Sequence, residues 1–184
     1  DMQGTLARFF VLPKLPEFVA RYPDIALNLS EADRMVDLIR EGVDCVLRAG
    51  VLSDSSLIGR RLTEFPQVTL ASPAYLDRYG RPASLEELQG HRMVAYTASS
   101  TGQAYPMEFE IAGKLVEIPL SFAVVVRGAE IYTAAGVAGL GVIHVPHYRV
   151  KHPGPVWQRV LCVSAIPPHR RTTHVLPPSR PPSP

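Results

Sequence analysis

Cysteine, tryptophan and long apolar runs are scarce in this sequence. Its 184 residues include two cysteines and one tryptophan, which is too little cysteine for a disulfide-stabilised scaffold. Cys45 and Cys162 lie far apart, each in an apolar run. One disulfide between them is an alternative to the favoured interpretation of two buried, reduced thiols, which suits the cytoplasm. No apolar run reaches the roughly 18 residues that a membrane-spanning helix needs.

A surplus of charge of one sign is also missing. Lysine and arginine number 19 against 17 for aspartate and glutamate, so the net charge is +2. The cations are scattered, apart from Arg60 with Arg61 and the run 169–171, and this chain alone carries no signature of a nucleic-acid-binding surface. A hydrophobic content of 46% indicates a soluble globular protein, long enough for one ordinary domain or two small lobes. No export signal is visible, and the sequence does not begin with Met.

Motifs of catalysis and metal binding are absent as well. No G-x-S-x-G elbow, H-E-x-x-H helix or phosphate-binding loop occurs, and the carboxylates fall on expected solvated faces or helix caps without forming an acid–base pair. His144 and His147, with His152 nearby, raise a metal hypothesis, but no carboxylate or cysteine lies close to complete such a site. We therefore expect no enzyme, no cofactor and no metal.

Three glycines cluster in the segment GVAGLGVIHVP, residues 136–146. A phosphate-binding loop needs the order strand, glycines, helix, because only a helix N-terminus offers free N–H groups to an anion. Here the helix-compatible run 129–135 comes first, and the β-branched run 142–145 follows, closed by Pro146. We therefore expect the glycines to join a helix to a strand, by supplying a left-handed stop and a close approach.

The first third of the chain alternates helix and strand patterns. Pro13 and Pro16 should divide the first helix, and Tyr22 with Pro23 should end it. Asp33 is a plausible N-cap of the second helix, and Gly42 its stop. The order predicts a parallel sheet with a preceding strand, of which Asp1 and Met2 look like the tail. The expected elements are a helix over 6–19, a strand over 24–31, a helix over 32–42 and a strand over 43–50.

The middle of the chain repeats this logic, which predicts two α/β lobes. Chain crossings between them are expected near 65–67 and 172–174. Pro66 should separate two extended runs, Pro73 should start a helix and Ser84 should cap another. The expected elements are extended runs over 56–65 and 67–73, helices over 73–80 and 84–90, a strand over 92–97, a hairpin over 107–118 turning at 112–114, a strand over 120–126, a helix from 129, and strands over 156–163 and 173–176.

In proteins with open α/β sheets, ligands bind at the carboxyl ends of the strands, near helix N-termini. Three junctions of this kind are Gln3, Gly4 and Thr5; Tyr96 and Thr97; and Arg127, Gly128 and Ala129. If the two lobes face each other, the junctions converge on one cleft. A guanidinium at Arg127 is suited to bind a carboxylate, although a solvated loop arginine is the alternative interpretation.

Several segments together carry a family resemblance: LPEFVARYPDIALNLSEADRMVDLIREGVDCVLRAGVLSDSSLIGRRL, ASPAYLDRYGRP, ELQGHRMVAY and AAGVAGLGVIHVP. In this order and spacing they resemble the effector-binding domain of LysR-type transcriptional regulators, from residue 1 to about 150 and more loosely through HVLPPSRPPSP. The resemblance implies an α/β fold like that of type II periplasmic binding proteins. In such a fold, two Rossmann-like lobes, expected over 1–65 plus 172–184 and over 66–171, would be joined by two crossover strands.

The resemblance also implies a function. A small effector would bind between the lobes, and the domains would form homodimers or tetramers through the helices over 6–19 and 129–138. A winged helix-turn-helix domain, absent from this chain, would bind promoter DNA. The family usually has a small hydroxyl residue at the position of Asp1 and an Asn-Asp-like pair at Arg127 and Gly128, and its 151–171 region is longer and more regular. The implied effector-binding residues are Asp1, Gln3, Gly4, Thr5, Tyr96, Thr97, Arg127, Gly128 and Ala129.

Two other functions remain as alternatives on this scaffold. A transport-type solute-binding protein shares the fold, but the lack of an export signal and the apolar first helix argue against it. An enzyme would need a nucleophile and a base in the cleft, and the residues assigned there supply neither.

Overall fold

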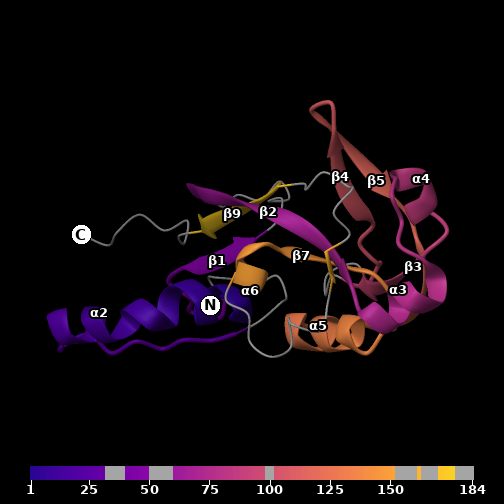
Figure 1. Ribbon diagram of the computed structural model, residues 1–184. Coiled ribbons are helices and arrows are strands. Elements are labelled where there is room, and N and C mark those ends of the chain that lie inside the picture. Colours follow the sequence, from indigo (N-terminus) through magenta and orange to yellow (C-terminus); the bar gives the residue numbers. More distant parts are fainter. Residues whose placement is uncertain (32–39, 50–59, 98–101, 152–160, 163–169, 177–184) are drawn as a thin grey trace. The chain divides into compact units, whose positions relative to one another are not determined.

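The computed structural model describes residues 1–31, 40–49, 60–97, 102–151, 161–162 and 170–176 of an α/β protein (Figure 1). The chain divides into two compact units: unit 1 is Asp1–Glu64 with Arg171–Pro184, and unit 2 is Phe65–Arg170. The elements are, in order, α1 (Gly4–Leu6), η1 (Ala7–Val11), η2 (Leu12–Lys14), α2 (Leu15–Arg21), β1 (Val46–Ala49), β2 (Arg60–Ala71), α3 (Pro73–Tyr79), α4 (Leu85–Leu88), β3 (Arg92–Tyr96), β4 (Met107–Ile111), β5 (Lys114–Ile118), β6 (Ser121–Val126), α5 (Ala129–Val137), β7 (Ile143–Pro146), α6 (Tyr148–Lys151), β8 (Leu161–Cys162) and β9 (Arg170–Leu176).

Unit 1 is organised around Met2, which forms parallel bridges with Glu31 on one side and Leu47 on the other. The expected parallel arrangement is thus present at these bridges. β1 also pairs antiparallel with β9, with Val46 opposite Leu176. The expected lobe boundaries, 1–65 with 172–184 and 66–171, stay a prediction for the organisation of the intact protein.

The first helix of unit 1 is divided where the prolines require. A π-helical stretch, η1, and a 3₁₀ turn, η2, separate α1 from α2 along the indigo segment of Figure 1. Pro13 lies at the start of η2, and Pro16 at the start of α2, where a missing N–H costs no helical hydrogen bond. α2 ends at Arg21, immediately before Tyr22 and Pro23. The predicted division and stop are confirmed.

Two expectations for unit 1 are wrong. Within the described part of the chain, segment 24–31 forms no ladder beyond the bridge at Glu31, and its alternating apolar side chains, Ile25, Leu27 and Leu29, are exposed. Cys45, expected to be buried, is a free and exposed cysteine, because β1 and its buried positions begin only at Val46.

Some expectations fall partly or wholly outside the described residues. The helix over 32–42 lies mostly there, with its N-cap Asp33. Gly42 is described and has the expected left-handed backbone, with φ of +63°. Most of 156–163 and the whole proline-rich tail over 177–184 also lie outside.

Unit 2 is built on β3, which has a parallel neighbour on each side. β6 pairs with it from Arg92 opposite Ser121 to Tyr96 opposite Val126. On the other side, Val142 pairs with Met93 through a parallel bridge that leads into β7. α5 connects β6 to this bridge, as the helix of a parallel crossover does.

β2 is continuous, although two runs separated by Pro66 were expected. The strand begins in unit 1 beside β9 and ends in unit 2 beside β7 and β8. Its ladder with β7 starts at Gln67, one residue after Pro66, and the Pro66 carbonyl accepts a hydrogen bond from His147 N at 2.8 Å. Proline is tolerated here because it precedes the first residue of this ladder.

Local turn and cap signals are confirmed in unit 2. The Ser72 hydroxyl accepts from Tyr75 N, and the Ser84 hydroxyl accepts from Glu87 N, each at 3.2 Å. These are N-caps of α3 and α4. The hairpin of β4 and β5 turns at Ala112 and Gly113, both with positive φ.

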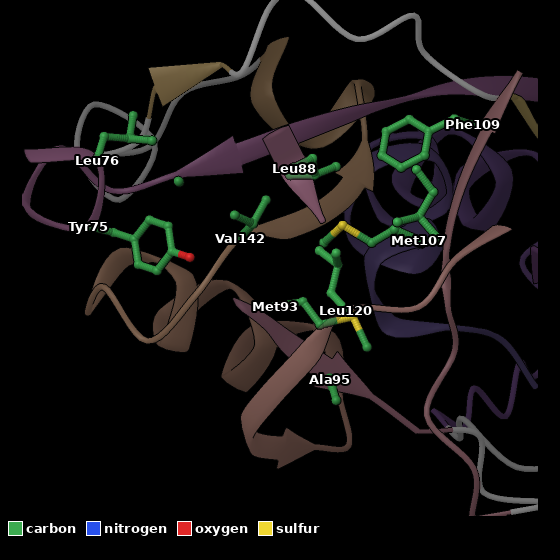
Figure 2. Packing of buried hydrophobic residues seen from close by; sticks show 11 residues of the cluster. Tyr75, Leu76, Leu88, Met93, Ala95, Met107, Phe109, Leu120 and Val142 are labelled. Carbon is green, nitrogen blue, oxygen red and sulfur yellow. The ribbon is translucent and has the colours of Figure 1, made fainter. Parts of the chain in front are cut away.

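The main core of unit 2 lies where α3, α4 and the hairpin meet β3. Figure 2 shows Met93, Met107 and Leu120 gathered in the middle of this cluster. Its buried members are Ala71, Tyr75, Leu76, Leu88, Met93, Ala95, Met107, Phe109, Ile118, Leu120 and Val142. A second cluster packs α5 against β3 and β7.

The glycines after α5 act as a joint between helix and strand, as predicted. α5 ends at Val137, and Gly139 has a φ of +80°. A Cβ on Gly141 would stand 2.6 Å from the Met93 carbonyl carbon and 2.8 Å from Val94 N. Glycine at position 141 therefore allows the backbone to reach β3.

We predict that Gly141→Ala lowers the free energy of unfolding by about 3 kcal/mol, because the methyl group overlaps backbone atoms that cannot turn aside. Gly90→Ala is the control, since its Cβ would meet only Glu87 O at 3.4 Å. Urea unfolding of both variants measures the difference. Equal midpoints would contradict the close approach.

His91 is buried beside the start of β3. It is 7% exposed, and its Nδ1 lies 3.3 Å from the Tyr75 hydroxyl oxygen. That hydroxyl donates to Arg92 O and accepts from Arg92 N, so the His91 Nδ1–H donates to it. Burial lowers the pKa of His91 below its ordinary value, against an opposing influence of the Glu87 carboxylate.

We predict that unit 2 loses stability as the pH falls from about 7.5 to about 5.5. The pKa of His91 is lower in the folded state, so the unfolded chain binds more protons in this window and unfolding becomes easier. His91→Asn keeps a donor toward Tyr75 and should flatten the pH dependence. Chemical unfolding at a series of pH values tests this, and an equally steep dependence in the variant would refute it.

Candidate functional site

Two strands of unit 2 end side by side at the start of α5. Tyr96 lies opposite Val126, and Thr97 N donates to Val126 O at 3.1 Å. Parallel strands present their carboxyl ends at one edge, so Thr97 lies next to the turn into α5. That helix begins at Ala129 after Gly128, which has a φ of +95° and no side chain to cap the first turn. The start of α5 therefore offers N–H groups to a bound partner.

Thr97 brings a buried hydroxyl to this edge. The residue is 5% exposed, and its Oγ1 forms no hydrogen bond with any residue that the structure describes. A buried hydroxyl without a partner costs about 1–3 kcal/mol, so it calls for an explanation such as a ligand. Arg127, which follows the last residue of β6, is exposed to solvent.

Tyrosine rings surround the end of β3. The Tyr96 ring centroid lies 6.4 Å from that of Tyr105, nearly parallel to it, and 5.3 Å from that of Tyr132, edge to face. The Tyr132 hydroxyl also accepts from His144 N at 2.9 Å. Sequence reasoning identified Tyr96 and missed the other two. The spacing of Tyr132 from Ala129 along a helix was the available signal.

Arg149 is the functional candidate that sequence reasoning missed most clearly. It is 4% exposed, and its Nη2 donates to Thr133 Oγ1 at 2.7 Å and to Ala129 O at 3.1 Å. Burial lowers its pKa, while Glu130, 3.8 Å away, opposes that shift. An arginine between Tyr148 and Val150 was the available signal. Arg149 therefore ties α6 to the first turn of α5.

Two of the residues expected at the site in unit 1 already bind neighbouring residues of that unit. The Asp1 carboxylate, 4% exposed, forms an ion pair with Arg48 and accepts from Ser30 Oγ at 2.7 Å. Gln3 Oε1 accepts from Ala49 N at 3.0 Å. Asp1 and Gln3 thus hold together the strand ends of unit 1.

The nine expected residues form one group in each unit. Asp1 and Gln3 lie in unit 1 beside Gly4 and Thr5, which open α1. The other five are those at the ends of β3 and β6 and at the start of α5. Their convergence on one cleft stays a prediction.

The described residues include no group of three histidines, cysteines or carboxylates able to hold a metal ion. The His144 ring packs edge to face on Phe109, and its Nδ1 lies 3.5 Å from Thr69 Oγ1. Within the described part of the chain, no helix is both long and apolar enough to cross a membrane.

A family model described as the LysR substrate binding domain matches residues 2–184. The chain belongs to this family. LysR substrate-binding domains have the type II periplasmic-binding-protein-like α/β fold, so the resemblance seen in the sequence is confirmed.

Relatives of this LysR substrate-binding domain are regulators. An uncharacterized HTH-type transcriptional regulator of Escherichia coli K12, YhjC, is 37% identical over 153 residues, which are 82% of this chain and 50% of that protein. CrgA of Neisseria meningitidis serogroup B is 32% identical over 150 residues, 82% of this chain and 49% of CrgA. The chain spans about half the length of these curated relatives.

The structure of the CrgA regulatory domain has a TM-score of 0.74 at 24% identity, covering 97% of this chain and 87% of that one. This likeness concerns the fold. The family and its relatives favour the effector-binding domain of a LysR-type regulator over a transport-type solute-binding protein.

We predict opposite effects on stability for two threonine substitutions in this LysR domain. Thr97→Val removes a hydroxyl that lacks a described partner, so the free energy of unfolding should stay equal or rise by about 1 kcal/mol. Thr133→Val removes an acceptor of buried Arg149 and should cost about 2 kcal/mol. Urea unfolding of both variants tests the pair. Destabilisation by Thr97→Val would mean that its hydroxyl is already satisfied.

Proposed function

We propose that this LysR domain senses a small organic molecule through the strand ends identified above, and that its binding controls transcription by the intact regulator. The observation that carries the proposal is the buried hydroxyl of Thr97 beside the start of α5. In a chain of this family, a polar group of that kind at a strand end is suited to bind an effector.

We further propose that the effector presents an anionic group to unit 2. The first-turn N–H groups of α5 carry the positive end of the helix dipole. Arg127 is exposed next to them, and a guanidinium forms paired hydrogen bonds with a carboxylate. A carboxylate is therefore the group that this edge of unit 2 suits.

We propose that the signal of effector binding reaches DNA in the way that the family resemblance implies. Effector binding would close the lobes or shift a homodimer or tetramer, and so reorient winged helix-turn-helix domains bound to promoter DNA in the cytoplasm. Exposed apolar side chains on both helices expected at the subunit contact support self-association. They are Phe10, Leu12, Phe18 and Val19 in unit 1 and Ile131 on α5.

The proposal includes no catalytic step. The family consists of regulators, and the polar groups at the proposed site, a threonine hydroxyl, helix N–H groups and arginines, bind and orient a ligand without forming a nucleophile–base pair.

The test is a thermal-shift screen of the purified chain against a library of small organic acids, amines and neutral metabolites. We predict that at least one compound stabilises the domain, and that Arg127→Ala weakens binding of a stabilising carboxylate about tenfold, the loss of one charged hydrogen-bonding partner. Arg81→Ala, another exposed arginine of unit 2, is the control. If no compound binds, the sensor function is refuted. If Arg127→Ala binds like the wild type, the anionic contact is refuted.

A further inference from the structure

Thr173 buries a hydroxyl in the sheet of unit 1. The residue is 2% exposed, and its Oγ1 forms no hydrogen bond with any residue that the structure describes. It lies on β9 directly opposite Ala49, the last residue of β1. A buried hydroxyl of this kind lowers stability, because it has lost its hydrogen bonds to water and gained none in return. Thr173 therefore calls for a partner that the described residues do not supply.

The Gln3 side chain lies along the other edge of β1. Its Oε1 accepts a hydrogen bond from Ala49 N at 3.0 Å. This bond fixes the orientation of the amide, because only the amide oxygen can accept a proton. Gln3 is partly exposed, and its Nε2 forms no hydrogen bond within the described part of the chain. Two N–H donors are thus held in place at the end of β1.

Thr173 and Gln3 flank the carboxyl end of one strand. Neighbouring strands lie about 5 Å apart, so the two residues are each about one strand spacing from Ala49, on opposite sides of it. β1 runs parallel to the chain at Met2, and the carboxyl ends of parallel strands are where α/β proteins bind ligands. A ligand atom at Ala49, whose side chain is a single methyl group, is within reach of both polar groups.

The fixed charges around this end of β1 balance one another. Arg48 and the Asp1 ammonium are positive, and the carboxylates of Asp1 and Glu31 are negative. The Asp1 carboxylate forms an ion pair with Arg48, the ammonium donates to Cys45 O at 2.9 Å, and the Glu31 carboxylate lies beside Gly4. These residues leave no surplus of either sign. Hydrogen bonding therefore selects the group that binds here.

We propose that Thr173 and Gln3 form a subsite of unit 1 that binds an uncharged oxygen of the effector, in a hydroxyl or a carbonyl group. The oxygen accepts from Gln3 Nε2 and from the Thr173 hydroxyl, and a ligand hydroxyl can also donate to Thr173 Oγ1. This inference rests on the proposed function and adds a chemical group that the effector carries. It requires no contact with unit 2.

Calorimetric titration of the purified chain with matched compounds tests the proposal. Lactate and pyruvate are compared with propanoate, and 3-hydroxybutanoate and acetoacetate with butanoate. Each stabilising compound of the library screen that carries a hydroxyl or carbonyl group is compared with its analogue lacking that group. We expect at least one oxygen-bearing compound to bind about tenfold more tightly than its analogue, because the analogue leaves the polar groups of the subsite unpaired.

Three variants separate binding from folding. Thr173→Val removes the hydroxyl at nearly constant volume and should abolish the preference. Its urea midpoint without ligand should equal or exceed that of the wild type, because the hydroxyl has no described partner to lose. Gln3→Glu keeps the acceptor for Ala49 N but lacks the N–H donors, so it should reduce the preference too. Thr63→Val, at an exposed position of β2 in the same sheet, is the control and should bind like the wild type.

The outcomes distinguish this proposal from the proposed function. Equal binding within every matched set, or an unchanged preference in Thr173→Val or Gln3→Glu, overturns the subsite. A lower urea midpoint of unliganded Thr173→Val also overturns it, since the hydroxyl would then be bonded within the chain. Compounds that stabilise the chain in the library screen leave the sensor function standing in each of these cases. If no compound in the screen or the titrations binds, both proposals fall.

Discussion

The architecture of unit 2 depends on β3 having a parallel partner along both of its edges. β6 and the Val142 bridge can flank it only because Gly141 brings the backbone after α5 within contact of Met93 and Val94. This pairing fixes where β3 and β6 end, and therefore where Thr97 lies relative to α5. The polar edge of unit 2 is thus a product of backbone hydrogen bonding as much as of side-chain chemistry.

Polar groups in this unit are buried at a cost that the surrounding core must offset. Thr97 and Arg149 are both almost fully enclosed, and neither would be favoured there for packing alone. The apolar cluster around Met93 and Phe109 supplies stabilisation in the same unit. Buried polar residues that lower the stability of a fold in this way are typical of binding sites.

Local features of the fold could be predicted, because their causes lie within a few residues. Pro73 after Ser72 starts a helix, and glycines after α5 stop one, whatever surrounds them. The errors concern long-range partners. A strand signal at 24–31 did not establish its neighbour, and Pro66 did not break β2, because the ladder with β7 begins beyond it.

The residues of the candidate site differ in the same way, because some could be predicted from local position and others depend on long-range contacts. Strand-end position identified Thr97 and the start of α5, since topology alone brings such residues to an edge. Arg149 was missed, because its importance comes from a contact with Thr133, which lies on another helix. Periodicity carries no information about such contacts.

Arg149 also has a mechanical consequence for unit 2. Its guanidinium bonds the carbonyl of Ala129 and the hydroxyl of Thr133 while its backbone belongs to α6. One side chain therefore links the first turns of α5 to the short helix after β7. Any group that orders one of these turns lowers the entropy cost of ordering the other.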